Sequence, residues 1–237
     1  PAGYLARTII QGKLDSSKVI RTVAALADTK ILVSVLILFA MVALAVLIPY
    51  GRNASARAAA LLVFIAGFAG ISFTMTGIMA YQSLFGYLYG RLAFLTGAFM
   101  AGLALGGWLG VKWSSAQDTS IRRLPLVQAA IAIAALLWML IFRMGGHPLA
   151  EPAFFFVAAF SGLVGGFLFP IADRVFRTAH TGTSSAGSLY AFDLAGASLG
   201  AILTGTLFVP GIGMVPTLLF IAGLNALAAV ATWAQRR

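Results

Sequence analysis

Residues 31–50 have the sequence ILVSVLILFAMVALAVLIPY, which contains no charged side chain and is bounded by Lys30 and Arg52. A helix needs about 20 apolar residues to cross the roughly 30 Å of hydrocarbon in a bilayer, where only internally hydrogen-bonded backbone is stable. This stretch therefore predicts a transmembrane helix and places the chain among integral membrane proteins.

The rest of the chain repeats this pattern. Of the 237 residues, 61% are apolar and 9% are charged, whereas roughly a quarter of the residues in soluble domains are charged. Six further apolar runs follow the first, at 58–82, 92–111, 124–142, 152–172, 188–209 and 215–233. We therefore expect an all-α integral membrane fold, a bundle of about seven transmembrane helices over residues 31–237. Pro and Gly at 210–213 predict a tight turn before the last helix.

The N-terminal segment, residues 1–30, differs because basic side chains alternate with its apolar ones. It has two interpretations: an amphipathic piece lying in the membrane interface, or a linker to an upstream domain. The pattern is equally compatible with both.

Basic residues near the ends of the spans predict the orientation, because Lys and Arg are retained on the cytoplasmic side. From residue 52 onward, nine basic residues fall on one side and two, Arg91 and Arg143, on the other. We expect a multi-pass protein of the inner or plasma membrane with a cytoplasmic C-terminus. The five basic residues of the first 30 oppose this assignment, unless a long translocated region precedes them.

The composition also bears on which partners and cofactors to expect. The net charge is +10, but the basic residues are scattered between apolar runs and form no single basic face, so we expect a lipid bilayer as partner and no nucleic acid. With no Cys in the sequence, disulfides and thiolate iron–sulfur ligation are excluded. No His or carboxylate cluster has metal-ligand spacing. We expect no cofactor, no metal and no catalytic residue in this chain.

Asp193 is the acidic residue that lies well within a long apolar run. A carboxylate there costs about 2.5–3.5 kcal/mol on insertion scales unless it is paired or hydrated. It is either a proton or cation site or a structural link between two spans, with Arg174 and Arg177 as possible charge partners. The candidate intramembrane polar site comprises Asp193, Tyr190, Gln82 and Asn225.

Glycines at four-residue spacing predict where helices approach closely, because small residues drive helix association in lipid. They form three series: Gly102, Gly106 and Gly110; Gly162 and Gly166; Gly196 and Gly200. Packing is the expected role, and lining a substrate path between moving halves is the alternative.

Two groups of motifs resemble the membrane domain of spermidine synthase-like proteins, which is itself similar to half of a major facilitator transporter. The first group is GFAGI at 67–71, YQSLFGYLY at 81–89 and AFMAGLALG at 98–106. The second is FPIADR at 169–174, GSLYAFDLAGASLGA at 187–201 and LFVPGIG at 207–213. The resemblance covers about residues 57–233 and implies that six of the seven helices form a facilitator-like half.

The chain departs from this family in two ways. Relatives often carry an acidic residue in the helix that corresponds to 58–82, where this chain has Thr74 and Thr76. Relatives also commonly carry a Rossmann-like aminopropyltransferase domain, for which this chain has no segment. We therefore expect a non-catalytic membrane subunit or domain that anchors or scaffolds a protein partner in a membrane complex. The alternative is a half-transporter-like unit that moves a small solute such as a polyamine or another cation.

Overall fold

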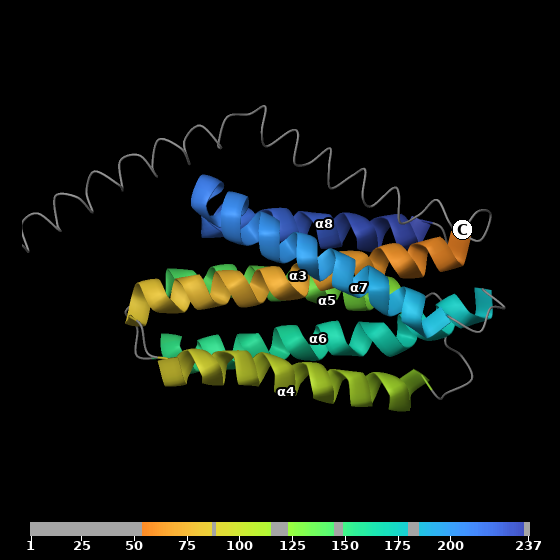
Figure 1. Ribbon diagram of the computed structural model, residues 1–237, viewed down its shortest axis with the longest axis horizontal. Helices are drawn as coiled ribbons and strands as arrows, with labels where there is room; N and C mark the ends of the chain where they lie inside the picture. The colour runs from red at the N-terminus through yellow and green to blue at the C-terminus, as the bar shows by residue number, and fades with distance from the viewer. Residues whose placement is uncertain (1–53, 87–88, 115–122, 145–148, 180–184, 235–237) are drawn as a thin grey trace, which may run out of the picture.

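The computed structural model describes residues 54–86, 89–114, 123–144, 149–179 and 185–234 (Figure 1). The predicted first span, 31–50, and the N-terminal segment, 1–30, lie outside these residues. Within them the fold is all-helical, and six helices are long and apolar enough to cross a membrane, as in a multi-pass membrane protein. The helices are α3 (Ala54–Phe85), α4 (Tyr89–Ser114), α5 (Leu124–Arg143), α6 (Ala150–Ala179), α7 (Ser185–Leu203) with the π-helix η2 (Thr204–Ile212), and α8 (Met214–Ala234).

The helices extend beyond the apolar runs that predict them. α3 has 32 residues, which at 1.5 Å per residue is about 48 Å and exceeds the roughly 30 Å of hydrocarbon. Backbone hydrogen bonds continue into the interface, where polar side chains are tolerated. Hydropathy therefore locates the membrane-embedded part of each helix and not its ends.

The turn expected at 210–213 is shorter than predicted. α7 continues as η2 through Pro210 to Ile212, and Gly213, with a φ of 92°, separates η2 from α8. Proline has no N–H to donate, so the helix widens into π geometry at this point and does not end. The break lies at Gly213 because glycine adopts a positive φ without a Cβ clash.

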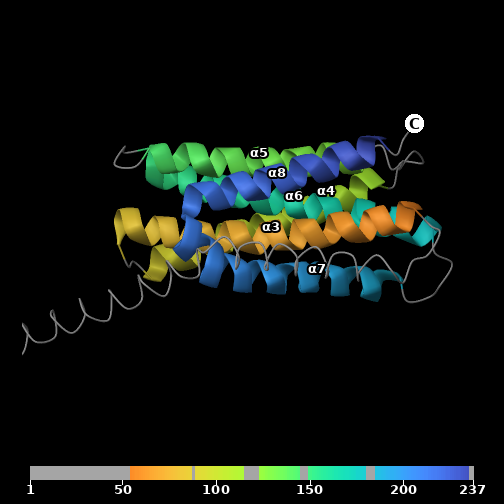
Figure 2. The same ribbon diagram turned by 90° about the horizontal axis from the view of Figure 1, so that it is seen from above.

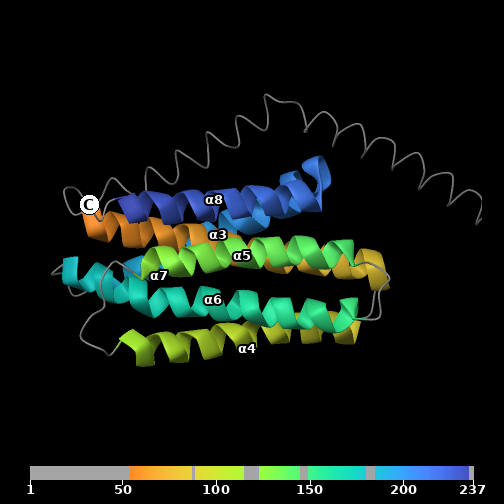
Figure 3. The ribbon, with the colours of Figure 1, turned by 180° about the vertical axis from the view of Figure 1, so that it is seen from behind.

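Three helix pairs make the most extensive contacts: α4 with α6, α3 with α7, and α5 with α8. Figure 1 shows α4 at one edge below α6, and Figure 2 shows α7 and α5 on opposite sides of the bundle. From behind, α5 and α8 lie on the near side (Figure 3). These pairs are related by an exchange of α3 with α6, α4 with α7 and α5 with α8. The exchange turns the α4–α6 pair into the α7–α3 pair and leaves the α5–α8 pair as it is. In these strongest contacts the exchange relates two sets of three helices, α3 to α5 and α6 to α8.

The predicted glycine series lie at the first two of these interfaces. On α4, a Cβ at Gly102 or Gly106 would overlap the backbone of α6 at Ala159 or Leu163. Gly162 and Gly166 of α6 face α4 in the same way, against backbone atoms of residues 99–107. Gly196 and Gly200 of α7 lie against α3 at Phe64 and Phe68. Backbone-to-backbone approach therefore joins α4 to α6 and α7 to α3, and any side chain in these positions would separate the helices.

Candidate functional site

A cavity of about 370 Å³ lies between α3, α4, α6 and α7. Five glycines line it, namely Gly67, Gly70, Gly107, Gly165 and Gly166. Glycine has no side chain, so several glycines on neighbouring helices leave space between those helices even where the helices are in contact above or below. Its volume falls within the usual range of about 300–1,000 Å³ for small-molecule sites.

Asp193 provides the only carboxylate among the described residues that line this cavity, and it lies beside Tyr190. It follows the start of α7 by eight residues, or about 12 Å along the helix axis. Gly67 gives it room, since a Cβ there would lie 2.7 Å from Asp193 Oδ1. The backbone of α7 therefore packs closely on α3 while the carboxylate stays at the cavity wall.

The arginines expected as partners do not pair with Asp193 within the described chain. Arg177 Nε instead lies 2.8 Å from Asp173 Oδ2, one helical turn away on α6. In the described ranges no hydrogen bond or ion pair joins the Asp193 carboxylate to another side chain. The compensation that an intramembrane carboxylate requires is therefore left to protonation, to water or a ligand in the cavity, or to residues outside those ranges.

The four residues of the predicted polar site separate into two cavity residues and two that lie elsewhere. Asn225 of α8 is fully buried, and its Oδ1 accepts a hydrogen bond of 2.7 Å from Gln128 Nε2 of α5. Its Nδ2 donates to the Ile221 carbonyl at 2.8 Å. Gln82 lies near the C-terminal end of α3 and does not line the cavity. Asn225 thus joins two helices, and Asp193 and Tyr190 are the pair that share the cavity.

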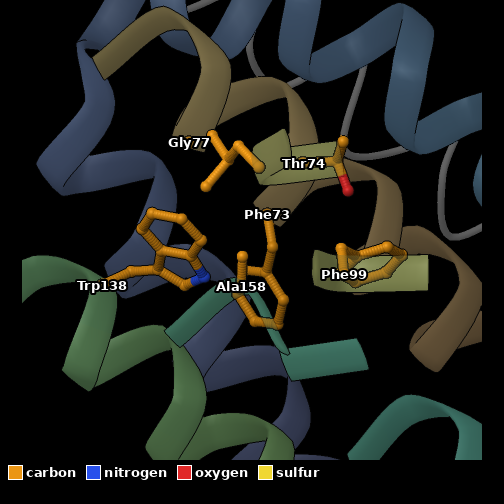
Figure 4. Close-up of a pocket in the computed structure, with 7 residues that line it drawn as sticks. Phe73, Thr74, Gly77, Phe99, Trp138 and Ala158 are labelled. Atoms are coloured by element: carbon orange, nitrogen blue, oxygen red, sulfur yellow. The ribbon is translucent and has the colours of Figure 1, made fainter. Parts of the chain in front are cut away.

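Aromatic rings form much of the remaining wall. The Phe169 and Tyr190 rings meet edge to face with centroids 6.4 Å apart, and Phe99 lines the cavity from α4. Phe99 also borders a much smaller void of about 10 Å³, where Figure 4 shows Trp138 on one side and Phe99 on the other. That void holds at most about one water molecule and is too small for an organic ligand.

A cluster at the opposite end of the bundle was missed at the sequence level. Tyr81 of α3 donates a hydrogen bond of 2.6 Å to Glu151 Oε1 of α6, and Arg91 of α4 pairs with the same oxygen. From the sequence, these residues indicated only the charged ends of membrane spans and an interfacial belt of aromatic side chains. A usable signal was that Glu151 and Arg91 flank spans on the same predicted side, so their opposite charges could meet.

The comparisons with known proteins add no relative. No protein-family model matches the sequence, and no curated protein or solved structure is significantly similar to it. The site's chemistry therefore rests on its own residues.

Proposed function

We propose that this chain is a membrane unit of the spermidine synthase-like type, built like half of a major facilitator, which holds a small cation beside Asp193. The observation that carries the proposal is a cavity of about 370 Å³ with one carboxylate that has no partner in the described residues. A bound cation offsets the cost of that charge within the membrane.

The helix arrangement supports the transporter-like part of the proposal. Inverted sets of three helices recur in secondary transporters, whose substrate sites lie at the interface between repeats near the middle of the membrane. Here the cavity is lined by α3 and α4 of one set and by α6 and α7 of the other. The distribution of basic residues along the sequence supports a cytoplasmic C-terminus under this proposal.

Thiol reagents of opposite charge test the cation site, since the sequence has no Cys and single-cysteine variants are unambiguous. Ala197→Cys lies one turn from Asp193 in the cavity wall, whereas Leu227→Cys lies on an exposed apolar face of α8, with 70% of its surface exposed. The reagents are the trimethylammonium-ethyl and sulfonatoethyl methanethiosulfonates. The rate at which each reagent modifies the cysteine is divided by its rate of reaction with free 2-mercaptoethanol. This ratio removes the intrinsic difference in reactivity between the two reagents.

At Ala197→Cys, we expect the cationic reagent to be favoured at least tenfold over that reference, because a carboxylate one helical turn away attracts it in a medium less polar than water. Adding Asp193→Asn should abolish this preference. Leu227→Cys should react with neither reagent. Equal relative rates at position 197, or a preference that survives Asp193→Asn, would rule out a cation site.

A scaffold function is the second candidate, and the exposure of α4 favours it. This helix packs mainly on α6 and leaves Phe94, Trp108 and Trp113 more than half exposed. In a bilayer such a face is covered by lipid or by a partner helix. A photo-crosslinking amino acid at Trp108, with one at Leu227 as the control, separates these cases in native membranes. A protein adduct of fixed mass at position 108 alone supports the scaffold, and lipid adducts at both positions count against it.

A further inference from the structure

The lining of the Asp193 cavity restricts the kind of cation that fits it, and this step rests on the proposed function. We propose that the ligand is an arylalkyl monoamine, with one positive charge and an aromatic body, and not a polyamine. Two features of the described lining carry the inference: the number of its carboxylates and the nature of its other side chains.

The charge of the lining matches a single ammonium group. Asp193 is the one carboxylate that the described wall contains, and its other polar side chain is the phenol of Tyr190. One ammonium can pair with Asp193 by a charge-assisted hydrogen bond. A polyamine such as spermidine would place its further charges against glycine backbone and apolar side chains, and burying an unpaired charge is costly.

The remaining lining matches an aromatic ligand. Phe99, Phe169 and Tyr190 approach the cavity from three different helices. Their rings can pack edge to face against a ligand ring, and their faces attract an ammonium group. Glycines around them let a flat ring approach the backbone. The ammonium group of an aliphatic amine would also use the carboxylate and the ring faces, but its alkyl chain would make no ring-to-ring contact.

The volume is sufficient for a small organic amine. About 370 Å³ lies within the usual range of about 300–1,000 Å³ for small-molecule sites. One aryl ring with a short alkylamine chain fits this space. Phenethylamine is therefore a suitable probe, phenethyl alcohol is its uncharged counterpart, and spermidine represents the polyamines.

Equilibrium dialysis of radiolabelled phenethylamine against the full chain in nanodiscs tests the proposal, with empty nanodiscs subtracted for bilayer partitioning. We expect one saturable site per chain. Asp193→Asn should weaken binding at least tenfold, whereas Asp173→Asn, which alters a carboxylate paired with Arg177 outside the cavity, should leave it within twofold. Phenethyl alcohol and spermidine should displace the probe at least tenfold less well than unlabelled phenethylamine.

Two glycine-to-leucine variants, one that fills the cavity and one that does not, keep the test decisive if Asp193→Asn does not fold. A Cβ at Gly165 meets nothing within 4 Å, so Gly165→Leu should fill the cavity without a backbone clash and weaken binding at least tenfold. Gly223→Leu, whose Cβ is equally free but lies on α8 outside the cavity, should bind within twofold of the original protein.

Three results would overturn the monoamine assignment: no saturable binding, equal binding by the Asp193→Asn protein, or displacement by spermidine as strong as by phenethylamine. The thiol-reagent ratio at Ala197→Cys separates this failure from failure of the proposed function. If that ratio favours the cationic reagent while phenethylamine does not bind, the cation site stands and the ligand class is wrong. If both measurements fail, both proposals are wrong.

Discussion

Replacing Gly102 by alanine should separate α4 from α6. A Cβ at this position would lie 2.8 Å from the carbonyl carbon of Ala159 and 3.0 Å from its Cα, whereas carbon atoms pack best at about 3.5–4.0 Å. The Ala159 carbonyl oxygen would lie closer still, so the helices must move apart by about 1 Å or more. Overpacking of this kind costs about 1–3 kcal/mol, and the carbonyl involved belongs to the backbone, which cannot rotate away.

Gly97→Ala is the matched control on the same helix. A Cβ at Gly97 meets nothing within 4 Å, so this substitution adds the same methyl group without a clash, and the helix propensity gained, about 0.8–1.0 kcal/mol at most, is common to both variants. The free energy of unfolding of Gly102→Ala should be about 2 kcal/mol lower than that of Gly97→Ala, roughly a 30-fold difference in the unfolding equilibrium constant.

Reversible unfolding by sodium dodecyl sulfate in mixed micelles, followed by tryptophan fluorescence, measures both variants. If the two free energies agree within about 0.5 kcal/mol, close backbone contact at Gly102 does not hold α4 against α6. The interpretation of the other glycine series would then fail with it, because it rests on the same geometry.

Three further tests use the same unfolding assay, each on a separate feature of the fold. A double-mutant cycle with leucine at Gln128 and Asn225 should give a coupling energy of about 0.6–1.7 kcal/mol for their 2.7 Å hydrogen bond, and a coupling near zero would contradict it. Tyr81→Phe removes the 2.6 Å hydrogen bond to Glu151 and should lower the unfolding free energy by about 1 kcal/mol; an unchanged value would mean that the phenol does not join α3 to α6. Gly213→Ala should cost about 1–3 kcal/mol, because φ is 92° at this position, and a neutral result would argue against that backbone conformation.

The packing glycines show how far the sequence predicts the fold. Four-residue spacing at Gly102, Gly106 and Gly110 indicates the face of α4 that approaches another helix, since these positions share one side of a helix. It does not indicate which helix lies there. The pairing of α4 with α6 depends on how all six helices pack together. No single segment of the sequence determines that packing.

The candidate site was predictable to a similar degree. The energetic cost of a carboxylate in an apolar run singles out Asp193, but its cavity is formed by glycines of α3, α4 and α6 that are far apart in sequence. Arg177, one of the two possible partners, instead pairs with Asp173, which lies one turn away on the same helix. Proximity in sequence was a poor guide to the partner of a group on a different helix.

Native mass spectrometry of the protein released from its own membranes tests most directly whether Asp193 holds a small cation. We predict a non-covalent adduct with the mass of a small amine that is present in the original protein and in Asp173→Asn but lost in Asp193→Asn. Identical adduct spectra for all three proteins would contradict it.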